Sequence, residues 1–74
     1  MKTWEFHQKV TEYRRLSGNE REGQSLYNVA HTCFNGEFMN FPEWGQSGGL
    51  DPFYNDSHCE AFLHFLAEKG YLEE

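Results

Sequence analysis

Histidine and cysteine side chains are the groups in this chain that could bind a metal ion. They occur at His31-Thr32-Cys33 and His58-Cys59, with His64 further along. Zinc requires ligands that converge from spacings such as Cys-x₂-Cys or His-x₃-His. On a helix, His31 and Cys33 are two positions apart and point about 200° away from each other, so they cannot hold one ion together. We therefore predict no metal site and no cofactor.

The same side chains could form a Cys–His nucleophile pair. Such a pair requires a thiolate beside a histidine in a partly exposed, electropositive place. Cys33 and Cys59 instead lie on apolar stripes, where free cysteine behaves as a small hydrophobe, and the chain has a net charge of −6. No expected strand leads into a phosphate-binding glycine loop or a serine elbow. We predict no catalytic residues and no enzymatic activity.

The clearest element is a helix in the middle of the chain. Its apolar residues recur at i, i+3, i+4 and i+7, and they are Leu26, Val29, Ala30 and Cys33. Asn19 with Glu22 is a capping signal at its start, and Gly36 follows its last turn. Gly23 falls in its first turn, where a close approach of the first helix's backbone would explain a glycine. Asn35-Gly36 would alternatively suit the turn of a β-hairpin.

Helices are also expected at both ends of the chain. The first would begin at a Thr3 cap and run to about Leu16, and the break Ser17-Gly18-Asn19 predicts antiparallel packing with the second. Near the other end, Asp51-Pro52 is a start signal, and Ser57 with Glu60 has capping-box spacing. The last helix would end at Gly70, with Tyr71 and Leu72 folding back, and its stripe is Cys59, Phe62, Leu63 and Leu66.

The segment from Glu37 to Leu50 has no clear period. Pro42 excludes a regular helix interior, so we expect one helical turn at 37–41 and then a flexible glycine loop.

Together these patterns predict an all-α fold. It is a compact three-helix domain with a short extra helical turn and a long aromatic and glycine-rich loop, in a single domain covering residues 1–74.

Charge and aromatic content indicate a surface that binds another protein. Residues 1–16 carry a net charge of +2 and residues 17–74 a net charge of −8, so direct binding to nucleic acid is disfavoured. Acidic groups could meet a basic surface or merely keep an aromatic-rich domain soluble. Rings are 18% of the residues, and some should stay exposed. The predicted contact residues are Glu37, Phe38, Phe41, Glu43, Trp44, Asp51 and Asp56.

The start of the chain predicts where the protein resides. Met1 is followed by charged and polar residues rather than by an apolar run, so we expect no signal peptide. No apolar stretch approaches the length of about 20 residues that spans a bilayer, so we expect no membrane partner. Two cysteines without a secretory signal indicate reduced thiols in a cytoplasm.

Two short blocks resemble a pattern in small uncharacterised proteins of tailed bacteriophages. The first block is Arg21-Glu22-Gly23-Gln24-Ser25-Leu26-Tyr27-Asn28, and the second is Asp51-Pro52-Phe53-Tyr54-Asn55-Asp56, followed by Phe62, Leu63 and Leu66. The resemblance covers roughly residues 6–66, and this chain departs from the phage pattern in its insert at 37–49. It implies a phage origin and assigns no catalytic residue.

The two blocks could also stabilise each other by direct contact. Gln24 and Asn28 could bond free backbone groups of the second block, while Phe53 fills the gap between helices. We therefore predict a small interaction protein in the host cytoplasm that binds, and through binding inhibits, a host protein or nucleic-acid-handling complex. The alternative is a phage-internal homodimeric accessory protein.

Overall fold

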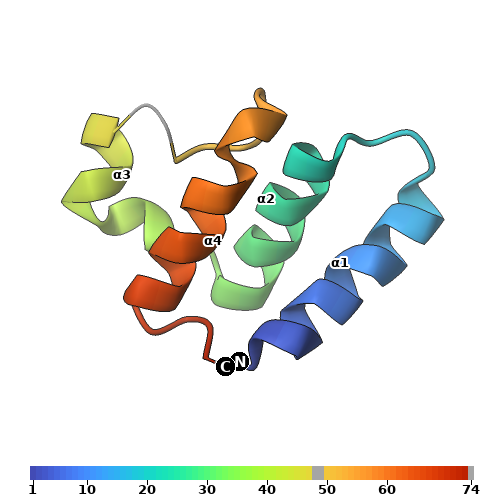
Figure 1. The fold of residues 1–74 in the computed structure, drawn as a ribbon, viewed down its shortest axis with the longest axis horizontal. Helices are drawn as coiled ribbons and strands as arrows, with labels where there is room; N and C mark the ends of the chain where they lie inside the picture. The colour runs from blue at the N-terminus through green and yellow to red at the C-terminus, as the bar shows by residue number, and fades with distance from the viewer. Residues whose placement is uncertain (48–49, 74) are drawn as a thin grey trace.

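The computed structural model describes residues 1–47 and 50–73, which form the all-α fold predicted from the sequence (Figure 1). In chain order its elements are α1 (Thr3–Ser17), α2 (Glu22–Phe34), the 3₁₀ turn η1 (Glu37–Asn40), α3 (Pro42–Ser47), the 3₁₀ turn η2 (Asp56–His58) and α4 (Cys59–Glu68). The described residues contain no strand, and their isolated bridge joins Lys2 to Glu73. Three long helices with shorter helical turns are thereby confirmed.

Helix α2 is the central element. It lies between α1 and α4, and α3 lies beyond α4 on the side away from α1 (Figure 1). Helices α1 and α2 run antiparallel across a short connection, as predicted, and both α1 and α4 pack on α2. The molecule therefore buries the apolar stripe of α2 against two other helices.

The core is built from the predicted stripes together with aromatic rings. Leu26, Phe62 and Leu66 are among its most deeply buried side chains. Phe38 meets Phe62 and Trp44 at ring-centroid distances of 5.5 and 5.2 Å, both in edge-to-face contact, which is a favoured geometry for aromatic pairs. The buried apolar residues are Phe6, Val10, Leu26, Val29, Ala30, Phe38, Phe62, Phe65, Leu66 and Leu72.

The segment expected to be a long loop is largely helical. The helical turn predicted at 37–41 is confirmed as η1, but α3 then occupies the place of the expected flexible loop. Pro42 is the first residue of α3, where its missing N–H removes no intrahelical hydrogen bond. Phe38 and Trp44 hold the segment against the core. Gly48 and Gly49 of the predicted loop lie outside the described residues.

Several predicted helix ends are shifted. Helix α2 begins at Glu22 with Arg21 at the N-cap position, so the Asn19 cap is wrong. Its C-cap, Asn35, is left-handed with φ 56°, and η1 follows Gly36, so the hairpin does not form. Thr3 lies inside α1, with Lys2 at the N-cap position.

The two start signals before α4 act as local turns. Asp51 Oδ1 accepts the Phe53 N–H at 2.9 Å, but no helix covers residues 51–55. Asn55 Oδ1 accepts the Ser57 N–H at 3.0 Å and caps η2, which runs directly into α4. The predicted Ser57 capping box is therefore wrong, because His58 is already the N-cap residue of α4.

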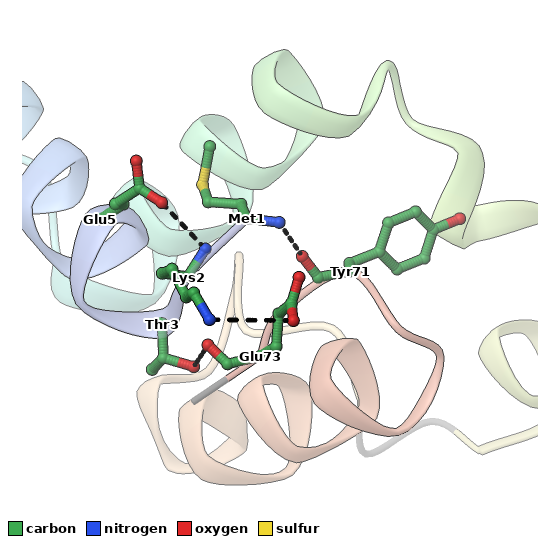
Figure 2. A network of polar contacts seen from close by, with 6 residues as sticks. All are labelled: Met1, Lys2, Thr3, Glu5, Tyr71 and Glu73. Carbon is green, nitrogen blue, oxygen red and sulfur yellow. Dashed lines mark hydrogen bonds and ion pairs between the residues drawn. The ribbon is translucent and has the colours of Figure 1, made fainter.

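The two ends of the chain are hydrogen-bonded to each other (Figure 2). The Thr3 N–H donates to the Glu73 carbonyl at 2.8 Å, and the Glu73 N–H donates to the Met1 carbonyl at 3.0 Å. The Met1 nitrogen donates to the Tyr71 carbonyl at 3.2 Å, and Lys2 Nζ lies 3.9 Å from a Glu73 carboxylate oxygen. We call this set of contacts the terminal staple. It fixes the first turn of α1 beside the end of the chain.

Residues 71–72 fold back as predicted. The Tyr71 N–H donates to the Leu66 carbonyl at 2.9 Å, and Leu72 is buried.

Among the described residues, no helix combines the length and apolarity needed to cross a bilayer.

Candidate functional site

The predicted contact residues on η1 and α3 belong mainly to the interior. Phe38 has no exposed surface, so its assignment to a contact surface is wrong. Phe41 and Trp44 are half-buried and pack on the core. Lys69 donates to Glu43 and lies 4.9 Å above the centre of the Phe41 ring. Glu37 is exposed at the start of η1, apart from these contacts.

Asp51 and Asp56 instead lie together on a single turn, residues 51–56, which we call the Tyr54 turn. Asp51 closes the turn locally through the Phe53 N–H, and Asp56 Oδ1 accepts the Gly23 N–H from the first turn of α2 at 3.0 Å. Near a helix N-terminus, a carboxylate also meets the positive end of the helix dipole. Both residues predicted from the second sequence block therefore position this turn.

Gly23 allows the turn to approach α2 closely. A Cβ built at Gly23 would lie 2.1 Å from the Pro52 carbonyl oxygen and 2.8 Å from Asp56 Oδ1, far inside van der Waals contact. The close approach predicted from the glycine is present, but its partner is the turn rather than the first helix. Only glycine fits here with this backbone in place.

Arg21 holds the other side of the turn. Its guanidinium donates to the carbonyls of Phe53 and of Tyr54, the latter at 3.2 Å. Gln24 and Asn28 were predicted to make such bonds and do not. Arg21 belongs to the same sequence block as Gln24 and Asn28. Its residue type could have indicated this role, because arginine has a planar fork of donors suited to two adjacent acceptors.

The fixed turn presents Tyr54 to solvent. Its side chain is 80% exposed and meets the Phe53 ring at a centroid distance of 4.8 Å. Phe53 packs in turn on Tyr27 of α2 at a ring-centroid distance of 5.4 Å. A hollow of about 180 Å³ lies beside the ring, lined by Tyr27, Asp51, Phe53 and Tyr54. Burial, and then the nearby Asp51 carboxylate, raise the pKa of Tyr27, which keeps its hydroxyl protonated.

A second polar cluster joins α1 to α2. The Glu20 carboxylate accepts from the Tyr13 hydroxyl at 3.0 Å, from Asn28 Nδ2 at 3.3 Å and from the Ser25 hydroxyl at 3.4 Å. Asn28 Nδ2 also donates to the Tyr13 hydroxyl at 3.2 Å. Glu20 is therefore a half-buried link between the two helices.

The residues with metal-binding or nucleophilic chemistry are not brought together. The described part of the chain contains no group of three His, Cys, Asp or Glu side chains placed to hold an ion. Cys33 and Cys59 are both half-buried. Burial, and then the charges of Glu22 and Asp56, raise the pKa of the Cys59 thiol, which disfavours the nucleophilic thiolate.

Residues 45–49 spell Gly-x-Ser-x-Gly, the letters of a serine elbow. Ser47 ends helix α3, whereas the serine of that motif sits on a turn that follows a strand. Gly48 and Gly49 lie outside the described residues.

Comparison with family models, with curated proteins and with solved structures gives no significant match for this chain.

Proposed function

We propose that this is a small, non-enzymatic interaction protein that binds a host protein through the Tyr54 turn. The observation that supports this is an aromatic ring, 80% exposed, on a turn that is held at the start of α2 by the Arg21 guanidinium on its backbone carbonyls and by the Gly23 N–H on its Asp56 carboxylate. Tyrosine is enriched among the residues that dominate binding energy at interfaces. A turn already fixed in one conformation loses little entropy when it binds.

The charge around the turn favours a basic partner surface. Asp51 and Asp56 flank Tyr54 in the sequence, and Glu22 and Glu60 lie on the adjoining helix starts. A partner would offer an apolar pocket for the ring and cationic groups around it. Surfaces that handle nucleic acid have this character. The phage-like sequence blocks point to a bacterial host, and we propose action in its cytoplasm by occupying such a surface.

Capture of host proteins with matched variants tests this function. Tyr54→Ala removes the exposed ring, while Trp4→Ala removes another exposed ring, on α1. We expect the parent protein and Trp4→Ala to retain a stoichiometric host protein, and Tyr54→Ala to lose it at unchanged thermal stability. Equal capture by both variants, or no stoichiometric protein with any of them, would contradict the proposal.

A homodimeric accessory protein is the second candidate. A dimer that buried Phe38, Phe41 and Trp44 between its two copies would favour this candidate, but these side chains pack on the core of a single copy, which weakens that version. The observation that favours a dimer is instead on α1, where Trp4 is 65% and Leu16 is 82% exposed. Light scattering at several concentrations separates the two candidates, because a dimer through α1 would double the mass and a Leu16→Glu change would restore the monomer.

A further inference from the structure

The hollow beside Tyr54 is a small aromatic pocket with one carboxylate in its wall. Its volume is about 180 Å³, and its lining residues are Tyr27, Asp51, Phe53 and Tyr54. None of the four is buried, because Tyr54 is exposed and the other three are half-buried. The walls of the pocket are therefore accessible to a ligand. Pockets for drug-sized molecules start at about 300 Å³, so this one suits the end of a single side chain.

The three rings of the pocket stand at steep angles to one another. The Phe53 ring meets the Tyr27 ring at an interplanar angle of 79° and the Tyr54 ring at 68°. Rings at such angles can enclose a small space, whereas parallel stacked rings would close it. The face of an aromatic ring carries partial negative charge and attracts a cation within about 6 Å of its centre. The aromatic lining therefore favours a cationic group over an anionic one.

The Asp51 carboxylate adds a full negative charge to the pocket. Its Oδ1 accepts the Phe53 N–H at 2.9 Å, which fixes the carboxylate in the turn. Within the part of the chain that the structure describes, no lysine, arginine or histidine nitrogen lies within 4 Å of it. After the larger effect of burial, the Asp51 charge raises the pKa of Tyr27, so its field reaches this ring. An apolar side chain in the pocket would take water from the carboxylate and offer it no partner, which is costly.

Arg21 also contacts the turn, but it does not line the pocket. Its guanidinium is bonded to the carbonyls of Phe53 and Tyr54. Asp56 on the turn and Glu22 at the start of α2 are negatively charged, as is Asp51. The turn and the start of α2 together are therefore net negative even with Arg21 counted, in a protein of net charge −6.

We propose that this pocket binds the guanidinium group of an arginine side chain on the partner protein. The inference rests on the proposed function, because it names the group that the Tyr54 turn recognises on the host protein. A guanidinium is planar, stacks on aromatic faces and pairs with carboxylates. It is also more weakly hydrated than an ammonium group, so it loses less on leaving water. In this pocket it would lie against the rings and pair with Asp51.

Titration of the full chain with capped amino acids tests the pocket. The probe is N-acetyl-arginine amide. One control is N-acetyl-citrulline amide, which has nearly the same shape without the charge, and the other is N-acetyl-lysine amide, which has the charge without the planar group. Binding is followed by the chemical shifts of aromatic ring hydrogens. We expect saturable, millimolar binding of the arginine probe at Tyr27, Phe53 and Tyr54, and at least about fivefold weaker binding of both controls.

Matched variants locate the charge that the probe recognises. Asp51→Asn should weaken binding of the arginine probe at least about fivefold while keeping the turn, because the asparagine Oδ1 can still accept the Phe53 N–H. An unchanged amide shift of Gly23, whose N–H is bonded to Asp56, shows that the turn is still in place. Glu12→Gln, at an exposed position on α1, removes the same charge elsewhere and should change binding by less than about twofold.

The results separate this inference from the proposed function. No saturable shift with the arginine probe, equal or tighter binding of either control, or full binding by Asp51→Asn would overturn the pocket assignment. A host protein retained by the parent protein and lost by Tyr54→Ala supports the proposed function whether or not the arginine probe binds. Binding of the probe without capture of a host protein would support the pocket and contradict the proposed function.

Discussion

The Asp56 carboxylate accepts the backbone N–H of Gly23 at 3.0 Å, although 33 residues separate the two. This bond joins the two sequence blocks that stand out along the chain. It also satisfies one of the N–H groups that every helix leaves open in its first turn. The capping group of α2 thus comes from a distant turn, so the start of the helix and the placement of Tyr54 share this contact.

Gly23→Ala should destabilise the protein even though alanine is the better helix former. Alanine gains about 1 kcal/mol of helix propensity. Its Cβ would stand 2.1 Å from the Pro52 carbonyl oxygen, so the turn must move away from α2. We expect a net loss of about 2–4 kcal/mol in the free energy of unfolding, measured by urea denaturation. Gly70→Ala is the control, because Gly70 has φ +87° and open space around it, and backbone strain alone should cost about 1 kcal/mol.

Arg21→Ala should loosen the Tyr54 turn. Two carbonyls lose a charged donor, and we expect about 1–2 kcal/mol lower stability together with faster amide exchange at residues 53–55. Arg21→Lys should recover only part of this loss, because an ammonium is a point donor that lacks the planar fork. Full rescue by lysine would show that charge alone, rather than the two-carbonyl geometry, holds the turn.

Glu20→Ala should weaken the contact between α1 and α2. The change leaves the Tyr13 hydroxyl, the Ser25 hydroxyl and the Asn28 amide without their shared acceptor. Unsatisfied, partly buried polar groups are costly, and we expect a loss of about 2–3 kcal/mol by urea denaturation. Glu12→Ala on the exposed side of α1 removes the same charge and should change stability by less than about 0.5 kcal/mol.

Glu43 should contribute to the pH dependence of stability. The hydrogen bond from Lys69, and then a backbone hydrogen bond, lower the pKa of Glu43 from its ordinary value of 4.5. The unfolded chain therefore binds this proton more readily than the folded one. The contribution is present above the ordinary pKa and is lost as pH falls through the lowered folded value.

Urea midpoints measured from neutral to acid pH check this contribution. Glu43→Gln should flatten the fall in midpoint at acid pH, whereas Glu37→Gln, at an exposed position on η1, should leave the slope close to that of the parent protein. Parallel curves for the parent protein and Glu43→Gln would contradict the assignment.

The sequence predicts the helices well because their period is a local property. Leu26, Val29, Phe62 and Leu66 all face the interior, as their spacing requires. Helix ends are less predictable from local signals. Asn19 has the right residue type for a cap, yet its neighbours Glu20 and Arg21 are held by Tyr13 and by the Tyr54 turn, so α2 starts two residues later than a cap at Asn19 would place it.

The candidate contact residues were harder to predict, for a physical reason. Aromatic residues at 38–44 are equally suited to a core and to a binding surface. Such residues become buried when other rings are available to pack on them. Here Phe62 and Phe65 of α4 provide those rings. Tyr54 has the same residue type and stays in solvent because the Arg21 and Asp56 bonds turn its segment outward. Such distant bonds leave no periodic pattern in the chain.

The terminal staple has a consequence for how the molecule opens. The amide of Thr3 donates to Glu73 and the amide of Glu73 donates to Met1, so neither hydrogen can exchange with solvent while the opposite end of the chain stays in place. Fraying, which in most chains proceeds separately at each end, must here be a single event. Deuterium should therefore enter both amides at the same opening rate, and truncating residues 71–73 should expose the start of α1 as fully as it exposes the end of α4.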